Sequence, residues 1–307
     1  MKLTILGSSS ALPTSERYPS AHVLSVHERL YLIDCGEGTQ MQFRRNKIRF
    51  SKLNHIFISH IHGDHVFGLY GLISTMNLMG RTLSLNLYAP AKYREILFSH
   101  LLDFDIVLGF NIDFIALDSN DPVKILDNRH LTVTSFPLRH RIPSYGFLFR
   151  EKAGDRNIKK ESIEKYNIPV ARIPAIKKGE DFVLGNGEII KNEEITVPGP
   201  APLSYAYCSD TMYFKRLSSF VKNVDLLYHE ATFEASLGEL ARITGHSTST
   251  DAARSAFEAK AGTLIIGHFS SRHKDVKHLV EEARSIFPRT IAAIDGTTYD
   301  VGNIDVP

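Results

Sequence analysis

Cysteine is scarce in this chain: only Cys35 and Cys208 occur among 307 residues, and neither belongs to a C-x-x-C pair. Each lies among apolar residues, so we expect two buried free thiols rather than a disulfide framework. Long apolar runs are missing too, since no stretch approaches the ~18 residues that a membrane-spanning helix needs. The first residues enter a strand pattern directly, without the charged and apolar regions of a signal peptide, and we expect a cytoplasmic protein.

An excess of charge is also missing. The chain has 36 basic and 34 acidic residues, a net charge of 36 − 34 = +2. Bulk charge therefore does not predict a nucleic-acid partner, and any surface for one must be local. A hydrophobic content of 43% supports a sizeable core. At this length a single large two-sheet sandwich is feasible.

Histidine, by contrast, is abundant, with 14 residues. Residues 60–65 contain four residues of the types that bind metal ions, namely His60, His62, Asp64 and His65. The apolar run at 55–59 predicts a short buried strand, and residues 66–79 predict an apolar helix. The four side chains therefore occupy a strand-to-helix turn on which they can converge. Imidazole with carboxylate suits zinc, and manganese or iron less well. Unrelated surface histidines are the alternative, which such tight spacing disfavours.

Other polar side chains also follow apolar strand patterns directly. His140 follows residues 131–137, Asp210 follows residues 204–208, and His268 follows residues 263–267. Strand ends along one edge of a layered α/β fold are where ligands gather. A single histidine at a strand end is usually solvated or satisfied, so the prediction rests on the joint pattern. With residues 60–65 it gives seven side chains, enough for two metal ions with a carboxylate between them.

The alternation of strand and helix patterns predicts a four-layer αββα sandwich of two similar halves that face one site. The strands are expected at residues 3–6, 22–25, 31–33, 85–88, 110–117, 131–137, 144–149, 204–208, 224–228, 263–267 and 290–294. The helices are expected at residues 36–52, 66–79, 91–102, 251–260 and 273–287.

Residues 151–197 break this alternation, because they are charged and show weak apolar periodicity. Residues 156–178 hold two acidic residues and seven basic ones, Arg156, Lys159, Lys160, Lys165, Arg172, Lys177 and Lys178. A connection this long is usually functional or disordered, and a simple surface insertion is the alternative. A second basic run without acids spans residues 44–52. It is a solvated helix end or a contact for phosphates.

Residues 60–65 match the HxHxDH signature of the metallo-β-lactamase superfamily, and the flanking residues 34–40 and 68–72 resemble those of ribonuclease Z, the tRNA 3′-processing endonuclease. Two further segments are typical of that family: residues 229–232 resemble its HEAT motif, and residues 246–248 resemble its HST motif. The resemblance implies one metallo-β-lactamase-type domain over residues 1–307, with a tRNA-binding arm inserted at about 151–197.

The resemblance also implies a ligand set for two Zn²⁺ ions per subunit, with Mn²⁺ as the alternative. The first ion would take His60, His62 and His140; the second would take Asp64, His65 and His268; Asp210 would bridge the two. The implied reaction is hydrolysis of the phosphodiester before the 3′ trailer, which leaves a 3′-hydroxyl on the tRNA. Asp64 matches the catalytic base, and His246, oriented by Glu230, would protonate the leaving oxygen. The alternative for His246 is a helix N-terminal residue that bonds its neighbours.

The resemblance predicts a homodimer in which the arm of one subunit contacts the tRNA bound to the other. Residues 13–18 resemble the PxKxRN-type loop near the cleavage site, but Ser15 and Tyr18 stand in place of lysine and asparagine. The arm also lacks the usual Gly-Pro pairs. The expected tRNA contacts are Arg17, Lys159, Lys160, Arg172, Lys177 and Lys178.

Two other functions are compatible with parts of the pattern. A superfamily hydrolase of a small phosphodiester or ester needs the same seven ligands, but neither the basic arm nor the two extra motifs. A metal-bound tRNA-binding protein without turnover would lack Asp64 or His246, and both are present. The sequence therefore predicts a metal-dependent endoribonuclease.

Overall fold

The computed structural model describes residues 1–306 and contains two seven-stranded sheets. In the first sheet the strand order is β18-β1-β2-β3-β4-β5-β6, and in the second it is β17-β16-β15-β14-β9-β8-β7. The strands of the first sheet are β1 (Lys2–Gly7), β2 (Ala21–Val26), β3 (Arg29–Ile33), β4 (Leu53–Phe57), β5 (Leu85–Pro90), β6 (Ile112–Leu117) and β18 (Thr298–Asp300). Those of the second are β7 (Val123–Asp127), β8 (Leu131–Pro137), β9 (Tyr145–Glu151), β14 (Ser204–Cys208), β15 (Leu226–Glu230), β16 (Thr263–Gly267) and β17 (Thr290–Ala292).

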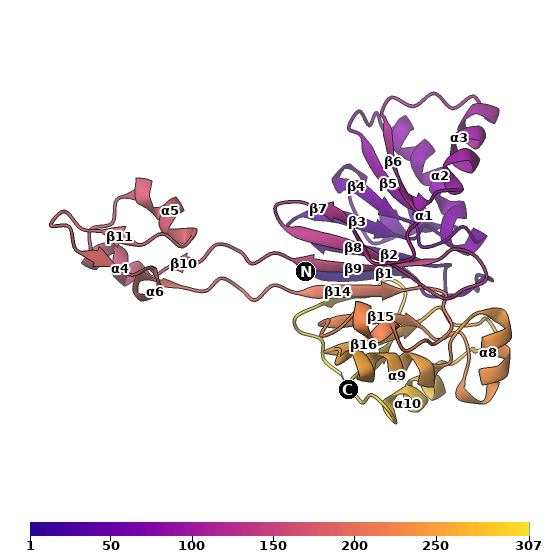
Figure 1. Cartoon of the computed structure of the whole chain (residues 1–307). Helices are drawn as coiled ribbons and strands as arrows, with labels where there is room; N and C mark the ends of the chain where they lie inside the picture. The colour runs from indigo at the N-terminus through magenta and orange to yellow at the C-terminus, as the bar shows by residue number, and fades with distance from the viewer. Residues whose placement is uncertain (307) are drawn as a thin grey trace.

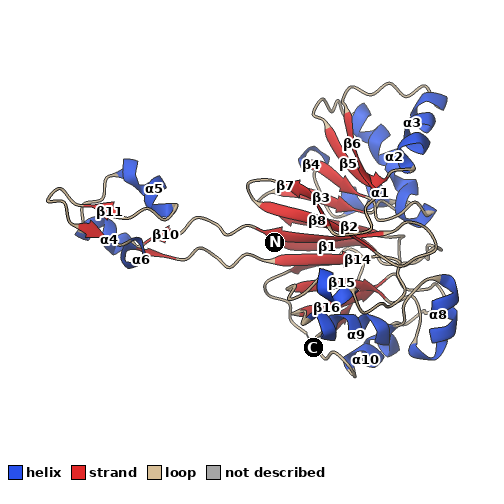
Figure 2. Ribbon diagram, viewed as in Figure 1, coloured by secondary structure: helices blue, strands red, loops and turns tan. Residues whose placement is uncertain are grey.

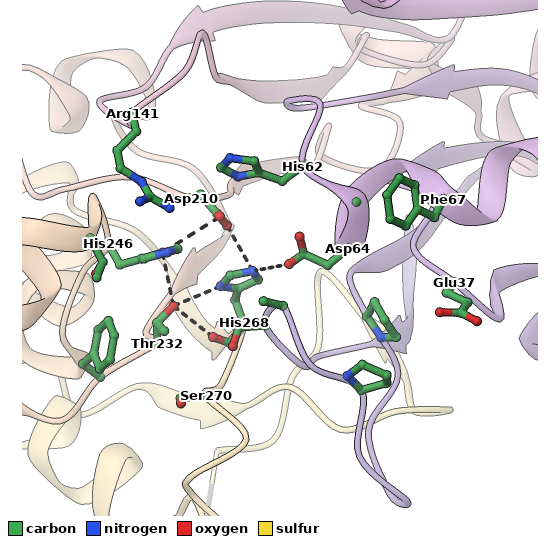
Figure 3. A pocket seen from close by; sticks show the side chains of 17 residues that line it. Glu37, His62, Asp64, Phe67, Arg141, Asp210, Thr232, His246, His268 and Ser270 are labelled. Carbon is green, nitrogen blue, oxygen red and sulfur yellow. Dashed lines mark hydrogen bonds and ion pairs between the residues drawn. The ribbon is translucent and has the colours of Figure 1, made fainter. Parts of the chain in front are cut away.

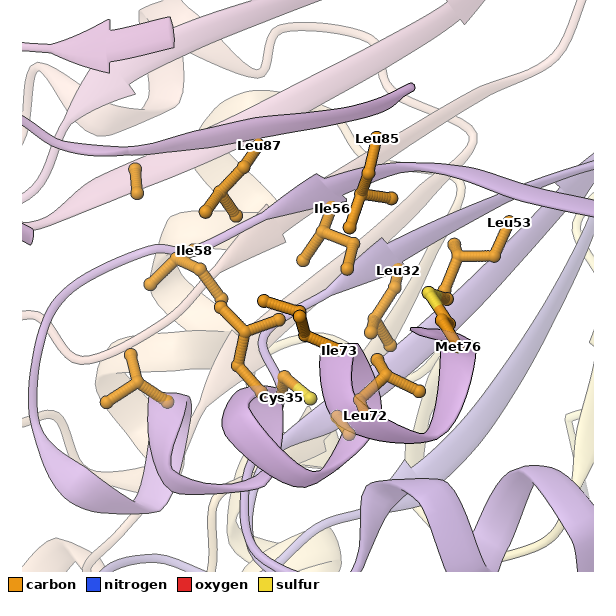
Figure 4. Packing of buried hydrophobic residues seen from close by; sticks show 14 of the residues in the cluster. Leu32, Cys35, Leu53, Ile56, Ile58, Leu72, Ile73, Met76, Leu85 and Leu87 are labelled. Atoms are coloured by element: carbon orange, nitrogen blue, oxygen red, sulfur yellow. The ribbon is translucent and has the colours of Figure 1, made fainter. Parts of the chain in front are cut away.

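Helices cover the outer faces of the two sheets (Figures 1 and 2). The first sheet carries α1 (Thr39–Arg45), α2 (Gly63–Leu78) and α3 (Tyr93–Asp103); the second carries α7 (Leu217–Phe220), α9 (Ser249–Ala259) and α10 (Lys277–Arg284), while α8 (Gly238–Thr244) lies beyond the strand ends. Figure 4 shows Leu72, Ile73 and Met76 of α2 against the side chains of β3, β4 and β5. A second core fills the space between the sheets, and aromatic side chains of both sheets meet there. The αββα prediction is confirmed.

Strand direction brings the predicted ligands to one edge. β3, β4 and β5 are mutually parallel, as are β14, β15 and β16. β8 is antiparallel to β9, which is antiparallel to β14, so β8 and β14 run in the same direction. Side chains that follow β4, β8, β14 and β16 therefore leave the sheets at carboxyl ends that face the same way.

Between β9 and β14 the chain makes a long excursion away from the sandwich (Figure 1). Two extended segments lead to a small lobe, residues 156–198, which we call the arm lobe. It contains β10 (Asn157–Ile158), α4 (Lys160–Lys165), α5 (Ile173–Lys177), β11 (Phe182–Val183), β12 (Ile189–Ile190), α6 (Asn192–Ile195) and β13 (Thr196–Val197). The lobe has its own buried cluster, Ile168, Ile176, Phe182, Ile190 and Ile195. The apolar residues come from elements too short to show a periodicity in the sequence.

Two predicted helices are shorter than expected. The helix predicted at 36–52 is α1, which ends at Arg45, because Lys47 takes a left-handed backbone conformation with φ 55°. A separate 3₁₀ turn follows at Phe50–Lys52. The helix predicted at 273–287 is α10, which begins only at Lys277. Both cysteines are buried and free, as expected. Among residues 1–306, no helix is long and apolar enough to cross a membrane.

Candidate active site

The first group of predicted ligands comes from three strand ends. His60 and His62 lie in the loop after β4, His140 follows β8, and Asp210 follows β14. One ligand atom of each lies within 4.8 Å of the others. The Nε2 atom of His60 is 3.0 Å from Nδ1 of His62, which is 3.3 Å from Nε2 of His140. The pKa of His62 is lowered to about 4, because burial and the neighbouring imidazoles disfavour its protonated form.

The second group joins the first turn of α2 to the end of β16. The Oδ2 atom of Asp64 lies 3.3 Å from Nε2 of His65 and 3.3 Å from Nε2 of His268. The two histidine nitrogens are themselves 3.3 Å apart. His268 holds its place with a left-handed backbone conformation, φ 57°, which is uncommon for a residue with a side chain. Backbone conformations of this kind gather at functional sites.

Asp210 lies between the two groups and presents one oxygen to each. Its Oδ2 is 3.3 Å from Nε2 of His60, whereas its Oδ1 is 3.1 Å from Nε2 of His268 and 3.5 Å from Nε2 of His65. Burial would raise the pKa of the Asp210 carboxyl, but the surrounding imidazoles hold it well below its ordinary value. This carboxylate is therefore placed to join two cation sites.

The outer ring nitrogens show which atoms face the centre. Nδ1 of His140 is 2.7 Å from the carbonyl oxygen of Gly245, which can only accept, so this nitrogen carries the proton. Nδ1 of His60 is 3.0 Å from Oγ of Ser59, whose own hydrogen goes to Asp34. The Nε2 atoms of His60 and His140 are therefore unprotonated, and the lone pair of each points toward Nδ1 of His62. Such a set is stable only around a cation, and it fits a divalent metal.

The second group follows the same logic. Nδ1 of His65 donates to Oδ2 of Asp34 at 2.8 Å. Nδ1 of His268 lies 2.9 Å from Oγ1 of Thr232, whose hydrogen goes to Glu230 at 2.8 Å. These partners fix the ring orientation and the tautomer of each ligand, as outer-shell groups do in metal sites.

Asp34 was missed by the sequence reasoning, although it anchors several parts of the site. It is fully buried after β3, and it accepts hydrogen bonds from the Ser59 backbone, the Ser59 hydroxyl and the Tyr207 hydroxyl at 2.6–2.8 Å, besides that from His65. Its position at a strand end beside the central motif was the available signal.

We expect Asp34→Asn to weaken metal binding about 10–100-fold, because the amide cannot match the carboxylate as a partner for the His65 Nδ1 proton. Competition with a chelator, followed by metal analysis, measures the affinity. Asp295→Asn is the control, since Asp295 is a partly buried carboxylate, bonded to Ser8 and Tyr18 and outside the ligand groups. Equal affinities for Asp34→Asn and wild type would contradict this role.

Glu230 and His246 form a pair beside the metal groups. Oε1 of Glu230 is 2.9 Å from Nδ1 of His246, and the Glu230 side chain is completely buried. The carboxylate is fixed by the backbone N–H groups of Thr211, Thr232 and Ser247 at 3.0–3.1 Å. Burial alone would lower the pKa of His246, but the carboxylates of Glu230 and Asp210 raise it to about 9. The imidazole therefore holds a proton at neutral pH.

His246 is also close enough to Asp210 and His268 to form a third possible ligand group. Its Nδ1 is 3.9 Å from Oδ2 of Asp210, but only 2.9 Å from Glu230. Its Nδ1 atom is thus already engaged by Glu230. This arrangement favours an acid–base role for His246 over a ligand role.

The site opens into a cleft of about 570 Å³ (Figure 3). His62, Asp64, Asp210, His246 and His268 line it, so the polar groups described above reach the solvent. Other lining residues were not singled out from the sequence. Arg141 brings a positive charge to the side of the cleft that carries His246, and Phe67, 64% exposed, lies on the opposite side. In the sequence, only its position next to His140 indicates that Arg141 lies near the site.

The predicted tRNA contacts do not form one surface. The guanidinium of Arg17 is turned inward: Nη2 donates to the carbonyl of His273 at 2.6 Å, and the group lies over the ring of Phe269. The other five residues are on the arm lobe: Lys159, Lys160, Arg172, Lys177 and Lys178. Lys160, Arg172 and Lys178 are exposed there, whereas Lys159 and Lys177 are partly buried.

The arm lobe also contains acidic residues after position 178, which the charge count over residues 156–178 did not include. Arg172 pairs with Glu180 at 3.7 Å, and Lys191 pairs with Asp181 at 2.9 Å. Lys159 donates to the backbone carbonyl of Glu194 at 2.7 Å. The free positive charge of the lobe is therefore smaller than the sequence window indicated.

Known proteins that are similar to this chain over nearly its whole length are named Ribonuclease Z. A Ribonuclease Z from Bacteroides thetaiotaomicron is 45% identical over 303 residues, which cover 98% of this chain and 96% of the relative. That of Cytophaga hutchinsonii is 42% identical over 303 residues, with the same two coverages. The family model of the Anti-Pycsar protein Apyc1 matches residues 1–172.

Solved structures agree on the fold. The short form of human tRNase Z is similar with a TM-score of 0.70 and 25% identity, over 100% of both chains. The metallo-β-lactamase fold protein YhfI from Bacillus subtilis gives a TM-score of 0.69 at 20% identity, over 97% of this chain and 98% of its own. The expected metallo-β-lactamase fold is thereby confirmed.

Proposed function

Because the chain belongs to the ribonuclease Z family, and over residues 1–172 also to the Anti-Pycsar protein Apyc1 family, we propose that it removes the 3′ trailer from precursor tRNA in the cytoplasm. The observation that carries this proposal is the Glu230–His246 pair beside the metal groups. Both residues lie beyond the 172 residues that the Apyc1 model matches. The reaction is phosphodiester hydrolysis that leaves a 3′-hydroxyl on the tRNA.

The ligand groups would hold two Zn²⁺ ions, with Mn²⁺ as the alternative: His60, His62 and His140 on one side, Asp64, His65 and His268 on the other, and Asp210 between them. Ions bound there would lower the pKa of a nucleophilic water and stabilise the negative charge that develops on the phosphate. An imidazole-rich donor set with carboxylates favours zinc over magnesium or calcium.

The remaining steps belong to the protein side chains. Asp64 lines the cleft and is held in its charged form, because the imidazoles of His65 and His268 keep its pKa low despite burial. We assign it as the acceptor of the proton of the attacking water, a transfer that a carboxylate of such low pKa can make because bound ions would also lower the pKa of that water. His246 lines the same cleft, and since its Nδ1 is bonded to Glu230, its Nε2 delivers the proton to the leaving 3′ oxygen. Arg141 is placed to contact a phosphate.

The arm lobe supports a homodimer with contacts in trans. It leaves the sandwich at the carboxyl end of β9, which runs antiparallel to β14, so the lobe projects from the sheet edge opposite to the metal groups (Figure 1). An arm in that position points away from the active site of its own subunit. A second copy of the chain is the simplest way to bring an arm lobe and a cleft to the same tRNA.

Exposed apolar side chains at the ends of α2 and α3 provide a surface for that second copy. Leu78 and Val107 are each 86% exposed, and Leu102 is 76% exposed. A hydrogen bond from the side chain of Asn77 to the carbonyl of Val107 ties the two segments together. Exposed apolar side chains on neighbouring segments are typical of interaction sites.

Deletion of the arm lobe separates the nuclease from a small-ester hydrolase. Asp155 and Gly199 are adjacent, since a Cβ on Gly199 would lie 2.7 Å from the Asp155 carbonyl oxygen, so a short Gly-Asn link can replace residues 156–198. We expect kcat/KM for a precursor tRNA with a 3′ trailer to fall by at least about 100-fold, as several phosphate contacts are lost. Hydrolysis of bis(p-nitrophenyl) phosphate should remain. If wild type leaves the tRNA intact but cleaves the small ester, the nuclease proposal is wrong.

Mixing two inactive chains tests the arrangement in trans. One chain is the arm deletion, and the other is full-length Asp64→Ala, which keeps its arm but lacks the base. Heterodimers then combine an intact cleft with an arm from the other subunit, and tRNA cleavage should recover. An arm that served only its own subunit would give no recovery in the mixture.

A further inference from the structure

A second cluster of metal-ligand side chains lies outside the active site. It consists of Glu234, His273 and His278, one ligand atom of each lying within 4.8 Å of the others. The three residues come from different segments: the turn after β15, the loop after β16, and the first turn of α10. None of them belongs to the two ligand groups of the active site.

The geometry inside the cluster is close to that of a coordination sphere. Oε2 of Glu234 is 3.5 Å from Nε2 of His278, and the rings of His273 and His278 lie 5.1 Å apart between centroids. Ligands about 2.0–2.1 Å from a tetrahedral zinc ion are separated by roughly 3.4 Å. The Glu234–His278 distance already matches this value. His278 is only partly buried, so its ring can turn toward His273.

His273 supplies an independent sign of a ligand. The residue is only 8% exposed, and its Nε2 atom is buried without a hydrogen-bond partner among residues 1–306. An orphaned buried nitrogen of this kind costs free energy unless something occupies its lone pair. Burial is the largest cause that lowers the pKa of His273, and it outweighs the opposing effect of the Glu234 carboxylate, so the ring is neutral and able to coordinate.

We propose that Glu234, His273 and His278 bind a further divalent transition-metal ion of the Zn²⁺ class, separate from the ions of the active site. Two imidazoles and one carboxylate form a three-ligand zinc set that leaves the fourth position to water. The same donors disfavour Mg²⁺ and Ca²⁺, which prefer all-oxygen ligands. Because Arg17 and Arg272 lie nearby and only one carboxylate is present, the ion is held less tightly than in the active site.

The ion would link the loop after His268 to the turn after β15 and to the first turn of α10. The same loop holds Arg17, whose guanidinium donates to the carbonyl oxygens of His273 and Ser270. Arg17 in turn ends the segment that contributes Ala11 and Pro13 to the wall of the cleft. The site therefore stabilises the frame on which one wall of the cleft rests, without touching the reacting atoms.

The test is the number of ions bound by the enzyme. Holoenzyme is dialysed against buffered micromolar Zn²⁺, and bound metal is measured by mass spectrometry for wild type, His278→Gln and Glu234→Gln. Both positions are partly exposed, so the variants should fold, and each should bind one ion fewer than wild type. Their tRNA cleavage should persist, which shows that the active-site ions remain. Added Zn²⁺ should also raise the melting temperature of wild type more than that of either variant.

His130→Gln is the matched control. His130 stacks on His27 at 4.7 Å, so it too is a paired histidine, but it belongs to none of the ligand groups found among residues 1–306. This variant should bind as many ions as wild type. Equal metal content in wild type, His278→Gln and Glu234→Gln would overturn the proposed site, whatever the outcome of the tRNA assays.

Discussion

Asp210→Asn should release metal from both ligand groups and reduce tRNA cleavage by at least about a thousandfold, since metal ions stabilise the transition state by several kcal/mol. Asp210 presents one oxygen to each group, at 3.3 Å from His60 and 3.1 Å from His268. An asparagine of the same shape keeps one oxygen and replaces the other by an NH₂ group, which has no lone pair for a cation. The loss of negative charge also leaves the two ions repelling each other without a carboxylate between them.

Metal content and cleavage of labelled precursor tRNA are measured on the same preparation. Asp225→Asn is the control, because Asp225 is a partly buried carboxylate of the same sheet that accepts two hydrogen bonds from Ser204, outside the ligand groups. It should keep both ions and its activity. An Asp210→Asn variant that retained the wild-type metal content and rate would rule out the bridging role.

The ligand groups could be predicted because strand direction determines where residues after a strand are placed. His140, Asp210 and His268 are far apart in the sequence, but each follows an apolar run that reads as a strand. Once the fold is a sandwich whose relevant strands run the same way, these positions must meet at one edge. The structure brings all seven predicted ligands to that edge.

The supporting contacts could not be predicted in the same way. Asp34 is bonded to His65, 31 positions later, and to Tyr207, 173 positions later, so its place after a predicted strand does not tell which residues it contacts. The core of the arm lobe combines residues of several short elements, none long enough to show a period. The early end of α1 depends on a left-handed residue, Lys47, for which the sequence gives no glycine signal.

His246→Gln should slow tRNA cleavage by about 10²–10⁴-fold, which is the usual contribution of a general acid. The effect should depend on the leaving group. A ribose 3′ oxygen must be protonated as it leaves, whereas p-nitrophenolate is stable without a proton. Hydrolysis of bis(p-nitrophenyl) phosphate should therefore fall far less than tRNA cleavage. An equal loss with both substrates would mean that His246 acts on binding or structure and not as the acid.

Glu230→Gln should change the pH dependence of the same step. Glu230 and Asp210 raise the pKa of His246 to about 9, so the imidazole keeps its proton up to about that pH. Without the Glu230 carboxylate the pKa falls toward the ordinary value of about 6.5, and a general acid loses activity as the pH rises through its pKa. The alkaline limb of kcat should thus move to lower pH, so that the variant is most impaired above neutrality and recovers in mild acid.

The amide of this variant faces several buried N–H donors, which costs about 1–3 kcal/mol of stability. A melting curve must therefore show that the protein is folded at each pH. Glu258→Gln, which changes a carboxylate bonded to Tyr213, keeps the wild-type profile if the effect is specific. A Glu230→Gln profile that is lowered at every pH without moving would show that Glu230 only positions the His246 ring. A profile that moves shows that it also determines when the ring can give up its proton.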